Sequence, residues 1–234
     1  MVIAADVSKA LAAVADPDSV QGKQRFFRTG PGEYGEGDRF LGVSVPDQRR
    51  IARSVKALPL NEIRTLLTTG AHEERLTALF ILVLKFGKAD EALRGEIVDL
   101  YLAHTAFVNN WDLVDSSAFQ LLGEWLVDRD RSVLDRLAGS ESLWERRIAI
   151  IATFAFIRRG DPEWTLRIAE KLVDDRHDLI HKAVGWMLRE VGNRDRDAEL
   201  RWLVRHQRTM PRTMLRYAIE KFAPEERRDF LAGA

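Results

Sequence analysis

The sequence predicts an all-α protein in which paired helices stack into an α-α superhelix, and three observations support this fold class. Apolar residues recur at spacings of three and four along almost the whole chain. Glycine and proline fall between these apolar runs. Three separate segments begin with a basic residue and continue as a small or apolar run. We find no segment with the alternating pattern of a convincing strand.

The predicted helices follow the apolar runs in chain order. These runs lie around 63–67, 76–84, 97–101, 110–125, 147–152, 168–172 and 184–191. Helix starts are indicated at Val45-Pro46, Asp161-Pro162, Met210-Pro211 and Ala223-Pro224, and helix ends near Gly87, Gly139, Gly160 and Gly192. Proline suits the first turn of a helix because that turn needs no backbone N–H from it.

The three similar segments are Arg75-Leu-Thr-Ala-Leu-Phe, Arg147-Ile-Ala-Ile-Ile-Ala and Lys182-Ala-Val-Gly-Trp-Met. Their spacing suggests a unit of roughly 35 to 40 residues with two helices, the range of HEAT-like solenoids. Such stacks curve, and their inner helices line a concave groove that can hold an elongated ligand. We therefore expect one domain over residues 1–234, with a compact helical bundle as the alternative.

Residues 30–44 interrupt the helical pattern as a glycine-rich loop insertion. Gly30 to Gly35 contain a formal G-x-G-x-x-G match. A dinucleotide site is rejected, because that motif requires a preceding strand and this loop follows a predicted helix and carries acids that would repel phosphate.

Composition excludes several classes of protein. The chain has 36 basic and 36 acidic side chains, so its formal net charge is zero and gives no push toward nucleic acid or membranes. There is no cysteine, which removes disulfides, thiolate nucleophiles and cysteine-based zinc sites. No signal peptide or transmembrane run is evident, so we expect a cytoplasmic protein with no membrane partner.

Trp111 and Asp115 are the first candidate site residues, because residues four apart share one face of a helix. An aromatic plane beside a carboxylate can hold a sugar-like group and stabilise positive charge on it. The structural alternative makes Trp111 a core residue and Asp115 a capping or solvated acid. Asp112, in the first turn, already suits the helix dipole, with Asn109 or Asn110 as the N-cap.

Lys182, Trp186 and Arg189 form a cation-aromatic-cation stripe on one predicted helix face, a pattern that suits a sugar-phosphate backbone. The alternative is a core tryptophan with basic neighbours that reach solvent. Gly185 indicates that something approaches this helix closely. His177 and His181 have metal-like spacing, but no third ligand is evident, so no metal site is expected.

Trp144-Glu145-Arg146-Arg147 begins another apolar helix. An arginine buried there either pairs with a carboxylate, such as that of Asp115, or binds a phosphate.

These motifs, in this order, resemble the DNA alkylation-repair glycosylases of the AlkD type, which are built from HEAT-like repeats. The similarity runs over most of the chain. It is carried by Arg25-Phe26-Phe27, Phe40-Leu41-Gly42-Val43 with Pro46, Trp111-Asp112-Leu113-Val114-Asp115, Trp144-Glu145-Arg146-Arg147 and Lys182-Ala183-Val184-Gly185-Trp186-Met187-Leu188-Arg189-Glu190.

The resemblance implies a monofunctional DNA glycosylase of base excision repair. It would hydrolyse the N-glycosidic bond of cationic N3- and N7-alkylpurines in double-stranded DNA, without a tight base-flipping pocket. By motif match, Asp115, Trp111 and Trp186 would be catalytic and Arg147 would hold a phosphate. Phe26 matches an aromatic residue that shapes the site in relatives. Lys182, Arg189 and Arg146 are further candidates for DNA contact.

We expect the protein to act as a monomer without a cofactor, in the cytoplasm and on the nucleoid when bound to DNA. The neutral composition predicts modest, salt-sensitive affinity for DNA. The glycine-rich loop follows Phe26 closely and can alter the preferred lesion. The alternatives are a non-catalytic binder of damaged or branched DNA and a protein-interaction scaffold that uses the groove.

Overall fold

The structure, a computed structural model, describes residues 2–233, and every regular element in that range is a helix. Contacts between Cα atoms divide the chain into two compact units, Met1–Ser117 (unit 1) and Ala118–Ala234 (unit 2), and each is considered by itself. Within the described residues, no helix combines the length and apolar character needed to cross a membrane.

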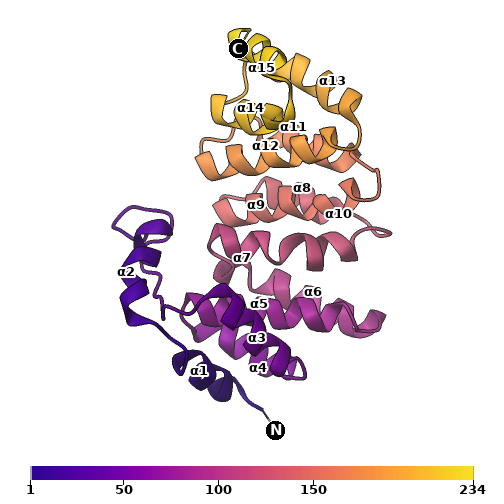
Figure 1. The fold of residues 1–234 in the computed structure, drawn as a ribbon. Helices are drawn as coiled ribbons and strands as arrows, with labels where there is room; N and C mark the ends of the chain where they lie inside the picture. Colours follow the sequence, from indigo (N-terminus) through magenta and orange to yellow (C-terminus); the bar gives the residue numbers. More distant parts are fainter. Residues whose placement is uncertain (1, 234) are drawn as a thin grey trace. The chain divides into compact units, whose positions relative to one another are not determined.

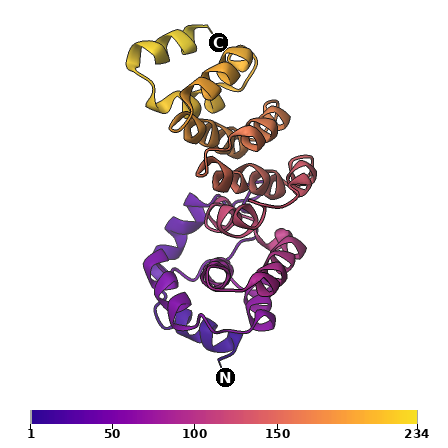
Figure 2. The ribbon, with the colours of Figure 1, turned by 90° about the vertical axis from the view of Figure 1, so that its right-hand side faces the viewer.

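Unit 1 is arranged around one central helix. Its elements are α1 (Ala4–Ala12), α2 (Pro17–Phe26), α3 (Val45–Ser54), α4 (Leu60–Thr69), α5 (His72–Phe86), α6 (Glu91–Ala103), the short 3₁₀ helix η1 (Thr105–Phe107) and α7 (Trp111–Asp115). Figure 1 shows their order, and Figure 2 shows α5 end on in the middle of the unit. Helix α5 packs against α1, α3, α4, α6 and α7, and most of its side chains are buried. Its burial on nearly all sides makes it the core of the unit.

Side chains cap the N-termini of three helices in unit 1. Asp16 accepts a hydrogen bond from the first turn of α2, Ser44 does so for α3, and Asp90 does so for α6. Each cap satisfies a backbone N–H that the helix itself leaves without a partner. The start of α3 at Val45 confirms the helix start expected at Val45-Pro46.

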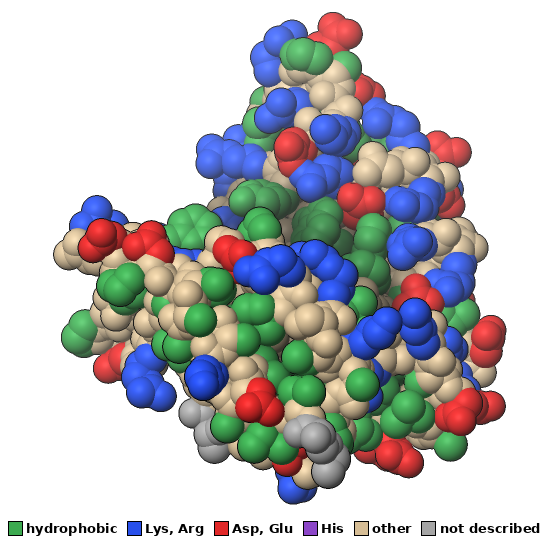
Figure 3. Space-filling view, turned by 60° about the horizontal axis from the view of Figure 1, so that its bottom comes forward, with side chains coloured by type: hydrophobic (Ala, Val, Ile, Leu, Met, Phe, Trp, Pro, Cys, Tyr) green, Lys and Arg blue, Asp and Glu red, His purple; other side chains and the backbone are tan. Residues whose placement is uncertain are grey.

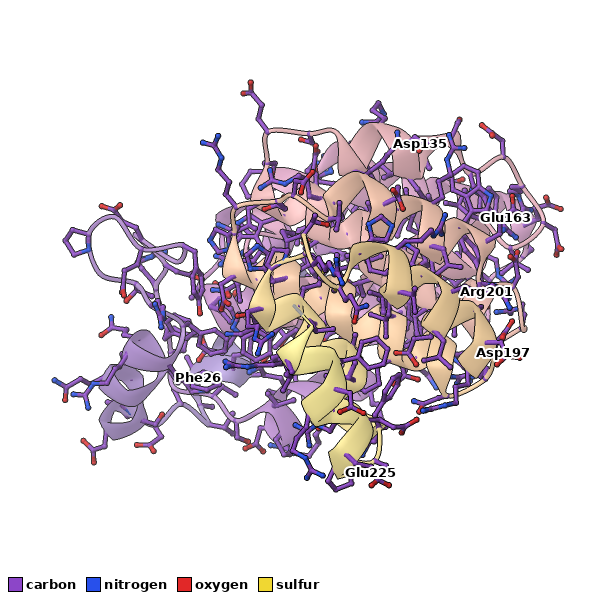
Figure 4. All side chains as sticks on the ribbon, turned by 90° about the horizontal axis from the view of Figure 1, so that it is seen from above. Phe26, Asp135, Glu163, Asp197, Arg201 and Glu225 are labelled. Carbon is purple, nitrogen blue, oxygen red and sulfur yellow. The ribbon has the colours of Figure 1, made fainter. Side chains whose placement is uncertain are left out.

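Unit 2 consists of helix pairs, as the sequence repeat predicts. Its elements are the π-helical segment η2 (Phe119–Gly123), α8 (Ser132–Ala138), α9 (Leu143–Ala152), α10 (Phe154–Ile157), α11 (Glu163–Leu172), α12 (Asp178–Gly192), α13 (Arg196–His206), α14 (Arg212–Ala218), η3 (Ile219–Lys221) and α15 (Pro224–Ala232). Helices α9, α12 and α14 pack in succession, and α8 packs with both α9 and α11. Figure 4 labels Asp135, Glu163, Asp197 and Arg201 along the side of unit 2 that α8, α11 and α13 occupy. That side is therefore charged, whereas α9 and α12 carry long buried runs.

Gly185 explains how α12 and α14 pack so closely. A Cβ atom at this position would lie 2.4 Å from the backbone oxygen of Met214 and 2.5 Å from Cβ of Tyr217. Any side chain here would push the two helices apart. The close approach that the glycine indicated is thus made by α14, and it requires no ligand.

The helix expected around 110–125 is not continuous, so this prediction was wrong. Helix α7 ends at Asp115, a turn follows at Ser116–Ser117, and residues 119–123 are π-helical. The buried hydroxyl of Ser117 donates to the backbone oxygen of Leu113 at 2.6 Å, and its oxygen lies 3.2 Å from the Tyr101 hydroxyl. A hydroxyl that bonds back to its own helix competes with the backbone ladder, which fits an interruption at this point.

The predicted all-α fold of helical repeats is confirmed. Residues 28–44 contain neither helix nor strand. That residues 30–44 are an insertion stays a prediction. Figure 3 shows Lys and Arg side chains interspersed with Asp and Glu on the face that it presents, in keeping with the zero net charge. The single domain and the concave groove stay predictions.

Candidate functional site

An aromatic cluster in unit 1 surrounds Trp111, the first residue of α7. The Trp111 ring stacks on Phe27, with 5.4 Å between centroids and 23° between planes, and meets the edge of Phe26 at 5.8 Å. Phe27 stacks in turn on Phe40 at 5.1 Å. Phe27 and Phe40 are buried, whereas Phe26, labelled in Figure 4, is 65 % exposed. Unit 1 therefore presents Phe26 and the half-buried Trp111 on a buried aromatic base.

Helix α7 carries Trp111 and Asp115 at its two ends. Asn110 is the N-cap, and its side-chain oxygen accepts from the Trp111 backbone N–H at 2.9 Å. Leu113 is buried, and Asp115 is half-buried. Burial raises the pKa of Tyr101, and the charge of nearby Asp115 raises it further. Asp115 thus lies at the edge of the core, near the buried Tyr101.

His72, the first residue of α5, lies between two carboxylates. Its Nδ1 is 2.8 Å from Oδ2 of Asp38, and its Nε2 is 2.8 Å from Oδ2 of Asp112. Burial lowers the pKa of His72, but the hydrogen bonds with Asp112 and Asp38 outweigh burial and leave that pKa above its usual 6.5. The ring also stacks on Phe40 at 4.5 Å and lies tilted against Phe27 at 4.8 Å, with 39° between planes.

Arg75 completes the charge balance around His72. Its Nη2 donates to Oδ1 of Asp38 at 2.8 Å, and its Nη1 donates to the backbone oxygen of Gly70 at 3.2 Å. Burial raises the pKa of the Asp38 carboxyl, but the His72 hydrogen bond and the Arg75 charge leave that pKa below 3.8. Two cations and two carboxylates therefore neutralise one another when His72 is protonated.

Glu73 fixes the chain that follows Phe40. Its carboxylate, 1 % exposed, accepts from the backbone N–H groups of Leu41 at 2.9 Å, Gly42 at 2.9 Å and Val43 at 3.2 Å. Gly42 has φ 87°, and a Cβ atom there would lie 2.0 Å from the Asp16 backbone oxygen. Glycine is required because the left-handed backbone and the close contact both exclude a side chain.

Trp186 belongs to an aromatic group in unit 2. Its ring lies 6.3 Å from Phe154, which meets Phe119 edge-on at 5.1 Å. The indole Nε1 donates to Oε1 of Glu190 at 3.3 Å, and Oε2 of Glu190 pairs with Arg194 at 3.0 Å. Trp186 is half-buried. Its indole is therefore held at one edge by a carboxylate of its own helix.

The cations of the α12 stripe have acidic partners. Lys182 Nζ lies 2.6 Å from Oδ2 of Asp178 and is partly exposed. Arg189 pairs with Glu220, and its side chain is only 17 % exposed. A phosphate at this face would have to compete with these carboxylates, and Lys182 is the more accessible cation.

The two arginines of α9 make separate contacts. Arg146 Nε donates to Oδ2 of Asp175 at 2.6 Å, and its Nη1 donates to the backbone oxygens of Ser140 and Glu141. Arg147 is 5 % exposed, and its Nη1 donates to the backbone oxygen of Leu179. Arg146 therefore joins α9 to the segment that leads into α12, and Arg147 joins α9 to the first turn of α12.

Trp111, Asp115 and Phe26 belong to unit 1, and Arg147, Trp186, Lys182, Arg189 and Arg146 belong to unit 2. Within unit 1 the structure brings Phe26 to Trp111. Sequence reasoning missed His72, Asp38 and Phe27. The one signal was the run His72-Glu73-Glu74-Arg75 ahead of a strongly apolar helix, since charges at the start of a buried helix need partners.

Comparisons with known proteins agree with this architecture. The model of a family described as DNA alkylation repair enzyme matches residues 7–222. Among solved structures, the chain is similar to one described as "Predicted DNA alkylation repair enzyme from Enterococcus faecalis", with a TM-score of 0.72 and 15 % identity over 90 % of this chain and 97 % of that one. At this identity the likeness shows the fold alone. No curated protein matches.

Proposed function

Because the chain belongs to the DNA alkylation repair enzyme family, we propose that it is a DNA glycosylase for cationic alkylated purines. The substrates would be N3- and N7-alkylpurines in double-stranded DNA. The observation that carries the proposal is that Trp111 and Asp115 occupy the two ends of one five-residue helix, with Phe26 against Trp111. This set suits a reaction in which positive charge moves from a base to a sugar.

The chemistry needs little acid catalysis. The C1′–N bond breaks, and its electron pair leaves with the purine and neutralises the positive charge that alkylation placed there. The deoxyribose acquires oxocarbenium character, which the Asp115 carboxylate would stabilise. Water then adds its oxygen to C1′ and loses a proton, and Asp115 would orient that water. Trp111 would pack on the sugar and add cation-π stabilisation, and Trp186 is the further catalytic aromatic residue that the family resemblance implies.

The basic residues would position the DNA backbone. Lys182 has the most accessible charge of the α12 stripe, since its side chain is 38 % exposed. Arg147, Arg146 and Arg189 would act from half-buried or buried positions, where their existing contacts fix their geometry. With a net charge of zero, binding should weaken steeply as salt is added, since most of the affinity would come from phosphate contacts.

Release of 7-methylguanine or 3-methyladenine from methylated duplex DNA tests the proposal. Asp115→Asn should lower the single-turnover rate by roughly 10²–10³-fold, the loss typical of removing one preorganised charge-stabilising group. Asp47→Asn is the matched control, because Asp47 lies in the first turn of α3 and is partly exposed beside Arg50. Equal release by wild type and Asp115→Asn would remove Asp115 from its role.

Two other outcomes would favour the alternatives. Salt-dependent retention of damaged DNA without base release would indicate a binder that has no glycosylase activity. Absence of DNA binding even at low salt would favour a protein-interaction scaffold.

A further inference from the structure

The His72 ring bonds to both the glycine-rich loop and the start of α7. The two distances, each 2.8 Å, join its nitrogens to carboxylate oxygens of Asp38 and Asp112. Carboxylates are acceptors, and a neutral imidazole has one N–H and one lone pair. Both contacts are hydrogen bonds only when both nitrogens carry protons. The geometry is therefore that of an imidazolium between two carboxylates.

Two routes lead from the His72 ring to Trp111. Asp112 is the residue directly after Trp111 and accepts from His72 while its Oδ1 accepts from the Leu113 backbone N–H at 2.9 Å. Phe27 lies against His72 at 4.8 Å and against Trp111 at 5.4 Å. The indole is thus held through its own chain and through its stacking partner.

Helix α7 needs such support, because it has only five residues. A helix this short has too few internal hydrogen bonds to fix its own orientation. Its orientation depends on the Asn110 cap, on the buried Leu113 and Val114, and on the bond from Asp112 to His72. Of these, only the His72 bond reaches a neighbouring helix through a charged group.

We propose that His72 is a positioning residue, which as an imidazolium joins Asp38 to Asp112 and thereby holds Trp111, Asp115 and the glycine-rich loop in one arrangement. This rests on the proposed glycosylase function for its effect on catalysis. The pair of hydrogen bonds from His72 to Asp38 and Asp112, called the bridge below, does not depend on that function. His72 is too deeply buried to meet DNA, with an exposure of 2 %, so its effect passes through its neighbours.

The charged groups at and near His72 lie on the loop, α7, α5 and α2. They are Asp38 from the loop, Asp112 from α7, Arg75 and Glu73 from α5, and Lys23 from α2, 3.9 Å from Glu73. Glu73 is engaged by backbone N–H groups and faces residues 41–43. Loss of the His72 proton would leave Asp38, Asp112 and Arg75 with a net charge of minus one in a buried site. The bridge therefore favours the protonated ring.

The sign of the pH dependence follows from the raised pKa. The bridge stabilises the fold fully below pH 6.5, the ordinary value for histidine, and loses that contribution as the pH rises through the higher folded value. Asp112→Asn keeps an oxygen acceptor but removes one negative charge. This variant should therefore lose the stabilising contribution of the bridge at a lower pH than wild type, while the hydrogen bond to His72 remains.

The first measurement uses the free protein. Titration of the His72 ring by NMR should give a pKa above 6.5 that falls in Asp112→Asn. Hydrogen exchange should show faster exchange in residues 28–44 and 110–116 of His72→Gln, with residues of α4 unchanged. His104→Gln is the control, because His104 bonds to the Leu100 backbone oxygen of its own helix. A pKa at or below 6.5, or exchange equal to wild type, would overturn the bridge.

The second measurement separates catalysis from binding. In His72→Gln, single-turnover release of 7-methylguanine should slow by roughly 10–100-fold, the scale expected when a catalytic group is misplaced by about 1 Å, with little change in DNA affinity. The activity of wild type should decline as the pH rises above the pKa of His72, and the activity of Asp112→Asn should decline at a lower pH than that of wild type. If His72→Gln is unfolded, the Asp112→Asn pH profile still decides. Unchanged rates and profiles in both variants would refute the positioning role.

These measurements distinguish the two proposals. Absence of base release by wild type would refute the glycosylase, and the NMR and exchange results would still decide whether His72 holds the loop to α7. A raised pKa with normal exchange and normal catalysis would show a charged histidine that positions nothing.

Discussion

Glu73→Gln tests how the chain around Phe40 is fixed. In wild type, Oε1 accepts from the Gly42 and Val43 backbone N–H groups, and Oε2 accepts from the Leu41 N–H. A glutamine can keep its oxygen toward the first two. Its NH₂ group would then face the Leu41 N–H, so two donors would oppose each other in a site that is 1 % exposed.

The cost follows from these contacts. One hydrogen bond to a charged acceptor is lost, at about 1.5–3 kcal/mol, and the other two lose their charge assistance. We expect the free energy of unfolding to fall by about 3 kcal/mol in total. Because Phe40 precedes this segment and stacks on His72 and Phe27, the aromatic base under Trp111 should loosen as well.

Urea unfolding of both variants at one pH gives the measurement, with Glu74→Gln as the matched control. Glu74 is the next residue, is half-buried and accepts one backbone N–H, that of Ala71 at 2.6 Å. Its glutamine retains an acceptor, so the loss should stay below about 1 kcal/mol. If Glu73→Gln costs no more than Glu74→Gln, the three backbone contacts do not stabilise the fold as argued.

Two further predictions concern unit 2. Gly185→Ala should destabilise the protein by about 1–3 kcal/mol despite the better helix propensity of alanine, because the added methyl would meet α14. Thermal unfolding tests this, with Gly87→Ala as the control because a Cβ there has ordinary contacts. Equal unfolding midpoints for the two variants would contradict the prediction. Burial raises the pKa of Glu199 to about 8, although Arg196 and Arg189 oppose the shift. The stabilising contribution of the neutral Glu199 carboxyl is complete below pH 4.5 and disappears as the pH rises through about 8. Glu199→Gln should therefore gain stability relative to wild type across that range. Parallel curves of unfolding free energy against pH for the two proteins would refute this.

Much of the candidate site was readable as local pattern. Trp111 and Asp115 fall on one helix because they are four residues apart, and Asn110 caps that helix as one of the two predicted asparagines. The assignment of Asp112 to the helix start was incomplete. Asp112 does accept a hydrogen bond from the Leu113 N–H, but it also accepts one from His72, which lies forty positions earlier in the chain.

The basic stripe shows the opposite case. Lys182, Trp186 and Arg189 lie on α12 as their spacing predicts, but Glu220 pairs with Arg189 from a different element. Spacing along a helix identifies which residues share a face. It carries no information about which acidic residue another helix brings to that face.

The sequence by itself determined the helical class, several helix boundaries and the motifs of the family, because periodicity, caps and prolines act over a few residues. Only the tertiary structure decided that Gly185 makes room for α14, that Glu73 binds the backbone at residues 41–43, and that His72 joins Asp38 to Asp112. Each of these contacts joins segments far apart in the chain, and each has a magnitude set by burial. Burial and long-range contact arise only when the helices pack, so no local pattern could contain them.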